Sequence, residues 1–114
     1  MRVIASITVN INDGLFLKKD HHFERVQFVD ILFFKADSNY CSIYTKSNYS
    51  NYAVALNTLE KQLPTNIFIR VHKSYVVNIN AVMGFEGNFL FIQQNRIPVS
   101  ELYKEAVFKL FNSI

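Results

Sequence analysis

Short segments that either alternate between hydrophobic and polar residues or are continuously apolar dominate the chain, which is the pattern of β-strands. Near the N-terminus, Ile7, Val9 and Ile11 are expected to share one strand face. Segment 29–36 is mostly apolar and predicts a fully buried strand. The expected strands, in chain order, are 4–11, 15–17, 23–28, 29–36, 40–45, 49–54, two within 68–78, 81–85, 88–93 and 96–99. Turn-forming residues separate several of them, at 12–14, 37–39, 46–48 and 87–88.

Two segments follow a helical period instead. Leucines recur at helical spacing in 56–63 and are followed by Pro64, which predicts a short amphipathic helix. A second helix is expected near the C-terminus, where Ser100 is a natural N-cap and Glu101 suits the positive end of the helix dipole. Its expected buried face comprises Leu102, Ala106, Val107, Leu110 and Phe111. The pattern predicts one mainly β domain with short helices over residues 1–114.

The composition fits a folded globular domain. The chain has 114 residues, of which 50% are hydrophobic and 15% aromatic, enough to bury a core without disulfides or metal. The single Cys41 cannot form a disulfide within the chain, which favours a reducing compartment, and we expect it to be buried as a small hydrophobic residue. The apolar stretch 3–9 is too short and too polar for a membrane-spanning helix or a signal peptide. We therefore expect a cytoplasmic protein with no membrane association.

Charge is distributed unevenly along the chain. The net charge is +3 and the pI is about 9.1, which is only mildly basic. No acidic residue occurs between Ser38 and Leu59, or between Lys61 and Phe85. Basic-type residues fall at these gaps: Lys46, Lys61, Arg70, His72 and Lys73. These residues either concentrate a positive field on one part of the surface, which would attract a polyanion, or are solvated side chains that cluster by chance. Charge alone does not decide between the two.

The segment 68–78 concentrates the candidate chemistry. Arg70, His72, Lys73 and Ser74 surround a short turn between two runs rich in isoleucine and valine. Such runs form buried strands, so they would hold these polar side chains at a defined place. A cluster of donors suits a surface made of acceptors, and nucleic acid offers them in its phosphates and purine edges.

A catalytic role for the same residues has little support. His72 and Ser74 would form a base–nucleophile pair, but no carboxylate lies nearby in the sequence to orient the histidine. The chain also has no glycine-rich phosphate loop and no cluster with metal-ligand spacing. We therefore expect no enzymatic activity, no metal and no cofactor.

Four segments resemble, in order, the LytTR DNA-binding domain of LytR/AgrA-like transcriptional regulators. They are Asp30–Tyr40, the leucine-rich helix before Pro64, Phe68–Asn78 and Ile97–Ser100. The resemblance covers about residues 15–110. It implies an elongated β-β-β arrangement of small antiparallel sheets with a C-terminal helix.

The resemblance also implies a function. This is sequence-specific binding to double-stranded DNA for bacterial transcriptional regulation, without a recognition helix and through loops that enter successive major grooves. Family members often bind as pairs on direct repeats, so a homodimer on such repeats and RNA polymerase are the further partners implied. Because members often have a receiver domain upstream, the chain is either a free-standing regulator or the C-terminal domain of a longer one.

Three loops usually carry base contacts in the family, and the resemblance places them at Asn39–Tyr40, at Lys73 and from Ser100. The Asn39 amide can form two hydrogen bonds with adenine, and Lys73 can donate to O6 and N7 of guanine. Phosphate contacts or support of the loops are expected of a wider set: Lys46, Arg70, His72, Ser74 and Arg96. For Arg70 two roles stay open, a phosphate contact or a buried bridge that supports the turn.

Glu101 departs from the family pattern, in which a basic residue commonly follows the serine. Its carboxylate can accept from N4 of cytosine, repel phosphates or neutralise the helix dipole. Lys104, one helical turn later, can contact the DNA backbone instead. The departure motivates a second hypothesis, a protein-interaction module of the same fold that has lost DNA binding and antagonises a related regulator. A third, single-strand binding, would need several aromatic side chains exposed on one sheet face.

Overall fold

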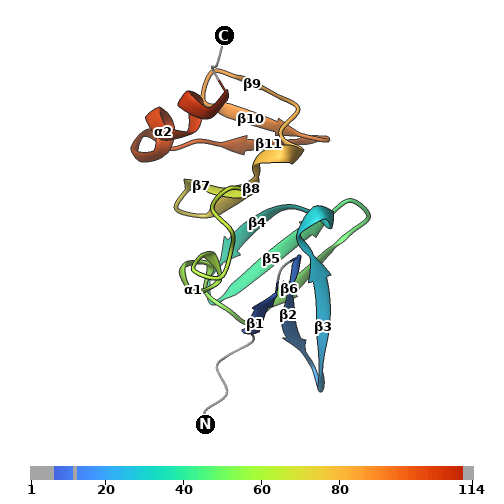
Figure 1. Ribbon diagram of the computed structural model, residues 1–114. Helices are drawn as coiled ribbons and strands as arrows, with labels where there is room; N and C mark the ends of the chain where they lie inside the picture. Colours follow the sequence, from blue (N-terminus) through green and yellow to red (C-terminus); the bar gives the residue numbers. More distant parts are fainter. Residues whose placement is uncertain (1–6, 12, 112–114) are drawn as a thin grey trace.

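Three small antiparallel sheets follow one another along the molecule and give it an elongated shape of 47 × 25 × 23 Å (Figure 1). The computed structural model describes residues 7–11 and 13–111. The first sheet contains β1 (Ile7–Ile11), β2 (Gly14–Lys19) and β3 (His22–Gln27), in that order. The last contains β9 (Gly84–Glu86), β10 (Phe89–Ile92) and β11 (Asn95–Pro98), with β10 in the middle.

The middle sheet has five strands in the order β6-β5-β4-β8-β7. They are β4 (Ile31–Asp37), β5 (Tyr40–Thr45), β6 (Tyr49–Tyr52), β7 (Phe68–His72) and β8 (Tyr75–Asn78). The helices are α1 (Leu56–Glu60) and α2 (Glu101–Phe111), and two 3-10 turns, η1 (Phe28–Asp30) and η2 (Ile79–Ala81), join the sheets. The elongated, mainly β fold with a C-terminal helix is confirmed.

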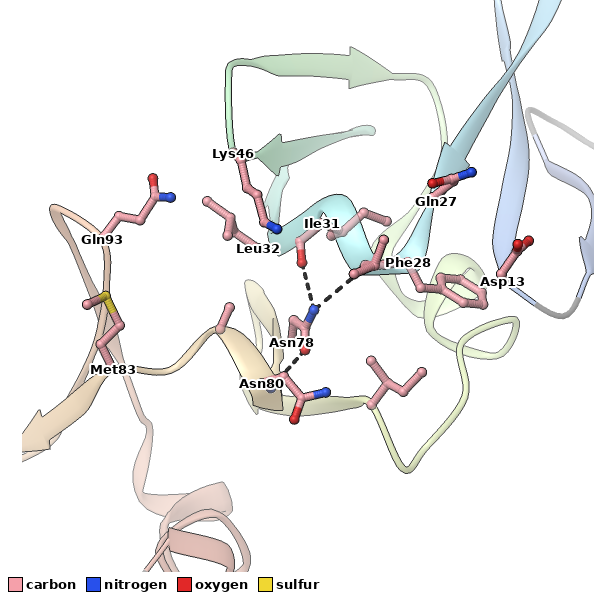
Figure 2. Close-up of a pocket in the computed structure, with 13 residues that line it drawn as sticks. Asp13, Gln27, Phe28, Ile31, Leu32, Lys46, Asn78, Asn80, Met83 and Gln93 are labelled. Atoms are coloured by element: carbon pink, nitrogen blue, oxygen red, sulfur yellow. Dashed lines mark hydrogen bonds between the residues drawn. The ribbon is translucent and has the colours of Figure 1, made fainter.

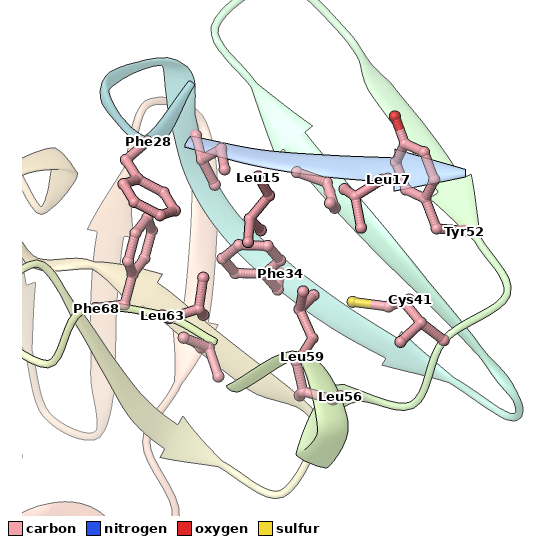
Figure 3. Packing of buried hydrophobic residues seen from close by; sticks show 14 residues of the cluster. Leu15, Leu17, Phe28, Phe34, Cys41, Tyr52, Leu56, Leu59, Leu63 and Phe68 are labelled. Carbon is pink, nitrogen blue, oxygen red and sulfur yellow. The ribbon is translucent and has the colours of Figure 1, made fainter. Parts of the chain in front are cut away.

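The middle sheet is covered on both faces, so adjacent residues of β4 enter different cores. Phe34 belongs to a core shared with the first sheet and α1, whereas Phe33 belongs to a core shared with the last sheet and α2. Figure 3 shows the first of these cores, in which Leu15 and Leu17 of β2 and Leu59 of α1 pack in one cluster with Phe34. This double burial explains why the sequence of β4 is mostly apolar rather than alternating.

Two glycines are required by the backbone. A Cβ at Gly14 would lie 2.6 Å from the carbonyl oxygen of Val26, because β2 and β3 approach closely there. Gly87 has a φ of +63° and makes the turn between β9 and β10, at the position predicted from the sequence.

The prediction of one buried strand over 29–36 is partly wrong. The chain turns between the first two sheets as η1, so β4 begins only at Ile31, and Val29 exposes 66% of its surface. Similarly, the turn η2 takes up the start of the strand expected over 81–85, and the observed strand is β9. There the Asn78 side chain accepts a hydrogen bond of 2.8 Å from the Asn80 backbone N–H and starts η2.

The ends of other helices and strands also differ from the predicted ones. Helix α1 ends at Glu60, earlier than expected, although all three of its predicted leucines are buried. Residues 4–6 of the first expected strand lie outside the described residues, as do the side chains of Ile7, Val9 and Ile11, whose shared face was expected. Within the described part of the chain, no helix is both long and apolar enough to cross a membrane.

The expected buried face of α2 is partly wrong: Val107 is buried and Phe111 packs against the core as predicted, whereas Leu102, Ala106 and Leu110 are exposed. The inward side chains are those of Tyr103, Val107, Phe108 and Phe111. Leu102 exposes 83% of its surface and Leu110 49%. Phe108 and Phe111 pack on the Phe85 ring, with centroid distances of 5.3 and 6.1 Å. The expected face through Leu102 and the observed face through Phe108 both fit the helical period. The observed face is the one that packs inward because its aromatic rings bury more area.

Cys41 of β5 lies fully buried in the first core, close to the turn between β4 and β5 (Figure 3). Burial raises the pKa of its thiol from 9.0 to about 12. The thiol therefore stays protonated at neutral pH, and the protonated form is a poor nucleophile. This supports a packing role for Cys41 and argues against a redox switch.

The rotation of α2 can be tested by truncating Leu102, which belongs to the expected face alone, beside Val107, which belongs to both the expected and the observed face. Val107→Ala should lower the free energy of unfolding by about 2 kcal/mol, because it removes two fully buried methyl groups. Leu102→Ala should change it by less than about 0.5 kcal/mol, because the side chain is exposed. Urea denaturation of both variants checks this, and a larger loss for Leu102→Ala would contradict the observed packing.

The buried thiol predicts slow chemistry. At pH 8, Cys41 in the folded protein should react with a thiol reagent such as DTNB far more slowly than in urea. The raised pKa also means that the unfolded chain loses this proton at lower pH than the folded one. The contribution of Cys41 to stability should therefore be intact below about pH 9 and decrease as the pH rises from there towards 12. Equal reaction rates in folded and unfolded protein would contradict the burial.

Candidate nucleic-acid interface

Two hairpin turns, Ser38–Asn39 and Lys73–Ser74, lie at the same end of the middle sheet. Strand β4 pairs antiparallel with both β5 and β8, and Lys35 lies opposite Tyr75. The Ala36 N–H donates to the Ser74 carbonyl oxygen at 2.8 Å, which joins the end of β4 directly to the second turn. The turn that closes β4–β5 and the turn that closes β7–β8 are therefore neighbours, although they are far apart in the sequence.

The start of α2 lies beside the same end of the sheet. The Ser100 N–H donates to the Val71 carbonyl oxygen at 3.0 Å, and Val71 belongs to β7, the edge strand nearest the last sheet. The order across the sheet is thus the first turn, the second turn and then Ser100–Glu101. In Figure 1, α1, the β7–β8 turn and α2 follow one another along the left-hand side of the molecule. We call Ser38–Tyr40, Lys73–Ser74 and Ser100–Glu101 the loop row.

The tips of the loop row present polar groups to solvent. Asn39, Tyr40 and Lys73 are exposed, while Ser74 is half-buried. Ser38 adopts a φ of +58°, which lets two residues close the turn between β4 and β5. The structure therefore brings Asn39, Tyr40, Lys73 and Ser74 together, as the sequence led us to expect.

Arg70 lies beneath the second turn and forms the buried bridge that was one of its two expected roles. Its Nε donates to the His72 carbonyl oxygen at 2.7 Å and its Nη2 to the Lys73 carbonyl oxygen at 2.5 Å. Its Nη1 donates to the Asn57 side-chain oxygen at 2.9 Å and to the Glu60 carboxylate at 2.5 Å. Only 12% of the Arg70 side chain is exposed.

His72 also supports the turn. Its Nδ1 accepts a hydrogen bond of 3.0 Å from the Ser74 backbone N–H, and its ring packs edge-on against Tyr75 at 5.6 Å. Because Nδ1 acts as an acceptor, the neutral ring must carry its proton on Nε2. His72 can therefore offer one N–H donor beside Lys73.

Two expected contacts lie away from the loop row. Lys46 follows β5 at the opposite end of the sheet, where it lines a groove of about 610 Å³ together with Asn78, Met83 and Gln93 (Figure 2). Arg96 lies in β11 near the turn at 93–94, and its guanidinium is 4.2 Å from the centre of the Phe89 ring. The structure does not bring either residue together with Asn39 and Lys73.

The third loop carries opposite charges. Glu101 occupies the first turn of α2, as expected from the helix dipole, and 90% of its side chain is exposed. Its carboxylate lies 3.9 Å from Nζ of Lys104. An exposed pair at this distance contributes little to stability, so both groups are free to interact with a partner.

Sequence reasoning missed the two α1 residues that hold Arg70. Asn57 and Glu60 gave no motif, because a five-residue helix carries little pattern. One signal was present, since Glu60 is the single acidic residue between Ser38 and Phe85. A lone carboxylate in a basic segment is a natural ion-pair partner for an arginine with limited exposure.

Comparisons with known proteins agree on one kind of domain. Residues 21–112 match the family model of the LytTr DNA-binding domain. The chain is 35% identical over 65 residues to the CO-responsive transcriptional regulator RcoM of Rhodospirillum rubrum, covering 54% of this chain and 28% of that protein. It is 28% identical over 89 residues to the sensory transduction protein LytT of Bacillus subtilis, covering 73% of this chain and 37% of that protein. The chain thus spans about a third of the length of these relatives.

A solved structure shows the same fold. It is a LytTr DNA-binding domain from Bacillus cereus, which superposes with a TM-score of 0.75 at 24% identity. The match covers 88% of this chain and 97% of that one.

Proposed function

Because the chain belongs to the LytTr DNA-binding domain family, we propose that it binds double-stranded DNA sequence-specifically, that it regulates transcription, and that the loop row is its contact surface. The observation that carries the proposal is the juxtaposition of the Asn39 and Lys73 turns at one end of the middle sheet. The family gives the class of partner, and this geometry gives the place where it binds. A regulatory DNA-binding domain of this family also accords with the expectation that the chain is not an enzyme.

The sheet constrains how the loop row meets a double helix. The two hairpin turns are two strand spacings apart, roughly 10 Å. Successive major grooves are about 34 Å apart along one face of the duplex, so the two turns cannot enter different ones. In place of the successive grooves expected from the resemblance, we therefore propose that both turns meet one major groove, about 12 Å wide, and its flanking phosphates. Of the proposed contacts, the segment Ser100–Lys104, on the far side of β7, is the one placed to approach a second groove.

Five side chains at the two hairpin turns have roles in this arrangement. Asn39 pairs with adenine and Lys73 with guanine, because an amide and an ammonium suit the edges of those bases and both residues are exposed. Tyr40 takes part in the readout beside Asn39, and His72 and Ser74 contact phosphates through single donors. Lys46 and Arg96 lie away from the row and are left out of the proposed contacts.

Protein partners belong to the same proposal. Pairs of copies on direct repeats and contact with RNA polymerase would use surfaces that the duplex leaves uncovered. The end of the sheet opposite the loop row, which includes the groove around Met83, is such a surface. The whole chain, residues 1–114, is proposed to form one domain.

One observation favours a second candidate function. The exposed carboxylate of Glu101 stands in the third loop, where a phosphate-facing surface would place a positive charge. A protein-interaction module of the same fold would tolerate this charge. Such a module would show no salt-sensitive binding to duplex DNA, which separates it from the first candidate.

Selection of bound duplexes from a random pool, followed by affinity measurements at several salt concentrations, tests the proposal. Lys73→Ala should lower affinity for the selected site by about 1–3 kcal/mol and relax preference at one base pair. Lys46→Ala is the matched control, because it removes the same exposed charge from the opposite end of the sheet. Its effect should stay below about threefold, and log Kd should change with log salt by about 0.9 per phosphate contacted.

Two results would contradict the assignment. An equal or larger loss of affinity for Lys46→Ala would show that the contact surface lies away from the loop row. Wild-type protein that shows no salt-sensitive duplex binding would favour the interaction module.

Glu101 gives a prediction of the opposite sign. If the third loop approaches phosphates, Glu101→Gln should raise duplex affinity by up to about fivefold, the effect of one exposed charge. Glu86→Gln, which removes an exposed carboxylate from β9, is the control for net charge and should change affinity less. Fluorescence anisotropy with the selected duplex checks both, and equal gains would show that Glu101 acts only through net charge.

A further inference from the structure

The geometry points to Arg70 as a positioning residue: clamped by Asn57 and Glu60 of α1, it fixes the shape of the Lys73–Ser74 turn without contacting DNA. This inference rests on the proposed function, because it divides the conspicuous basic segment into side chains that bind DNA and one that holds them in place. The sequence offered a phosphate contact as the other role for Arg70, so the distinction is testable.

The first support is what Arg70 binds within the turn. Its Nε and Nη2 donate to the carbonyl oxygens of His72 and Lys73, two consecutive peptide groups at the start of the turn. A guanidinium is planar and rigid, so two bonds to adjacent carbonyls fix the orientation of both peptide planes. The direction in which Lys73 leaves the backbone is set by those planes.

The second support is what holds Arg70 itself. Its Nη1 is shared by the Asn57 amide oxygen and the Glu60 carboxylate, so α1 anchors the guanidinium from the side away from the turn. Four donor–acceptor pairs occupy four of the five N–H groups of an arginine. With 12% of the side chain exposed, little capacity remains for a phosphate. The Glu60 carboxylate also offsets the positive charge that a phosphate would seek.

The third support is that the rest of the turn is also fixed. The Ser74 N–H donates to Nδ1 of His72, and the Ser74 carbonyl oxygen accepts from the Ala36 N–H of β4. Arg70 completes this set by tying the His72 and Lys73 carbonyl oxygens to α1. A lysine at position 70 would keep the charge but could not reach the same acceptors, because its donors radiate from a single nitrogen.

The test uses the full chain and the duplex obtained by selection, with a random duplex as the non-specific probe. Arg70→Lys should lower affinity for the selected duplex by about tenfold, the value of a lost charge-assisted hydrogen bond. Its affinity for the random duplex should fall by much less, and its salt slope should stay close to that of the wild type, because Arg70 itself contacts no phosphate and lysine keeps the charge. A phosphate contact would instead largely survive in Arg70→Lys, because lysine keeps the charge, so affinity for the selected duplex would stay near that of the wild type, which would overturn the inference.

Two further variants keep the test independent of folding. Glu60→Gln and Asn57→Ala leave Arg70 in place and weaken its anchor on α1. Each should therefore lower affinity for the selected duplex more than affinity for the random duplex. Glu60→Gln should cost much less in the Arg70→Lys background than in the wild type, since both changes act on one clamp. Additive losses, or an Arg70→Lys variant that binds like the wild type, would overturn the inference. Wild-type protein that binds no duplex would overturn the proposed function and the inference with it.

Discussion

The pairing of β4 with β8 is the constraint on which the rest of the structure depends. It joins two hairpins from distant parts of the chain into one sheet, with Phe33 opposite Val77, Phe34 opposite Val76 and Lys35 opposite Tyr75. A slip of one residue would exchange the two faces of a strand and send its large side chains into the wrong cores. The burial of Phe33 and Phe34 on opposite faces therefore locks the register, and the register sets the two turns side by side.

This constraint explains how so small a domain can offer a rigid binding surface. Both faces of the middle sheet are covered, so the polar side chains of its hairpins gather at the strand ends. The turns are short and tied to the backbone of neighbouring strands, as the bond from Ala36 to Ser74 shows. Loops fixed before binding lose little conformational entropy on meeting a partner, which leaves more of the contact energy as affinity.

Local signals predicted much of the fold and the two hairpin turns of the candidate site. The hairpin around Lys73 and the turn at Asn39 follow from strand-forming runs and turn residues, which act over a few positions. The rotation of α2 could not be read in this way, because the stripe through Leu102 and the stripe through Phe108 fit the same period. Lys46 and Glu60 depend on which strands pair and where α1 packs, so their places could only be seen in three dimensions.

Amide chemical-shift changes on addition of the selected duplex test the central claim most directly, because they report the contact surface without mutation. With uniformly ¹⁵N-labelled protein, the account predicts that the largest changes fall on residues 38–40, 73–74 and 100–104. The amide shifts of the turns at 46–48 and 93–94, which lie at strand ends away from the loop row, should change little. Changes concentrated on those two turns, with residues 39 and 73 unaffected, would contradict it.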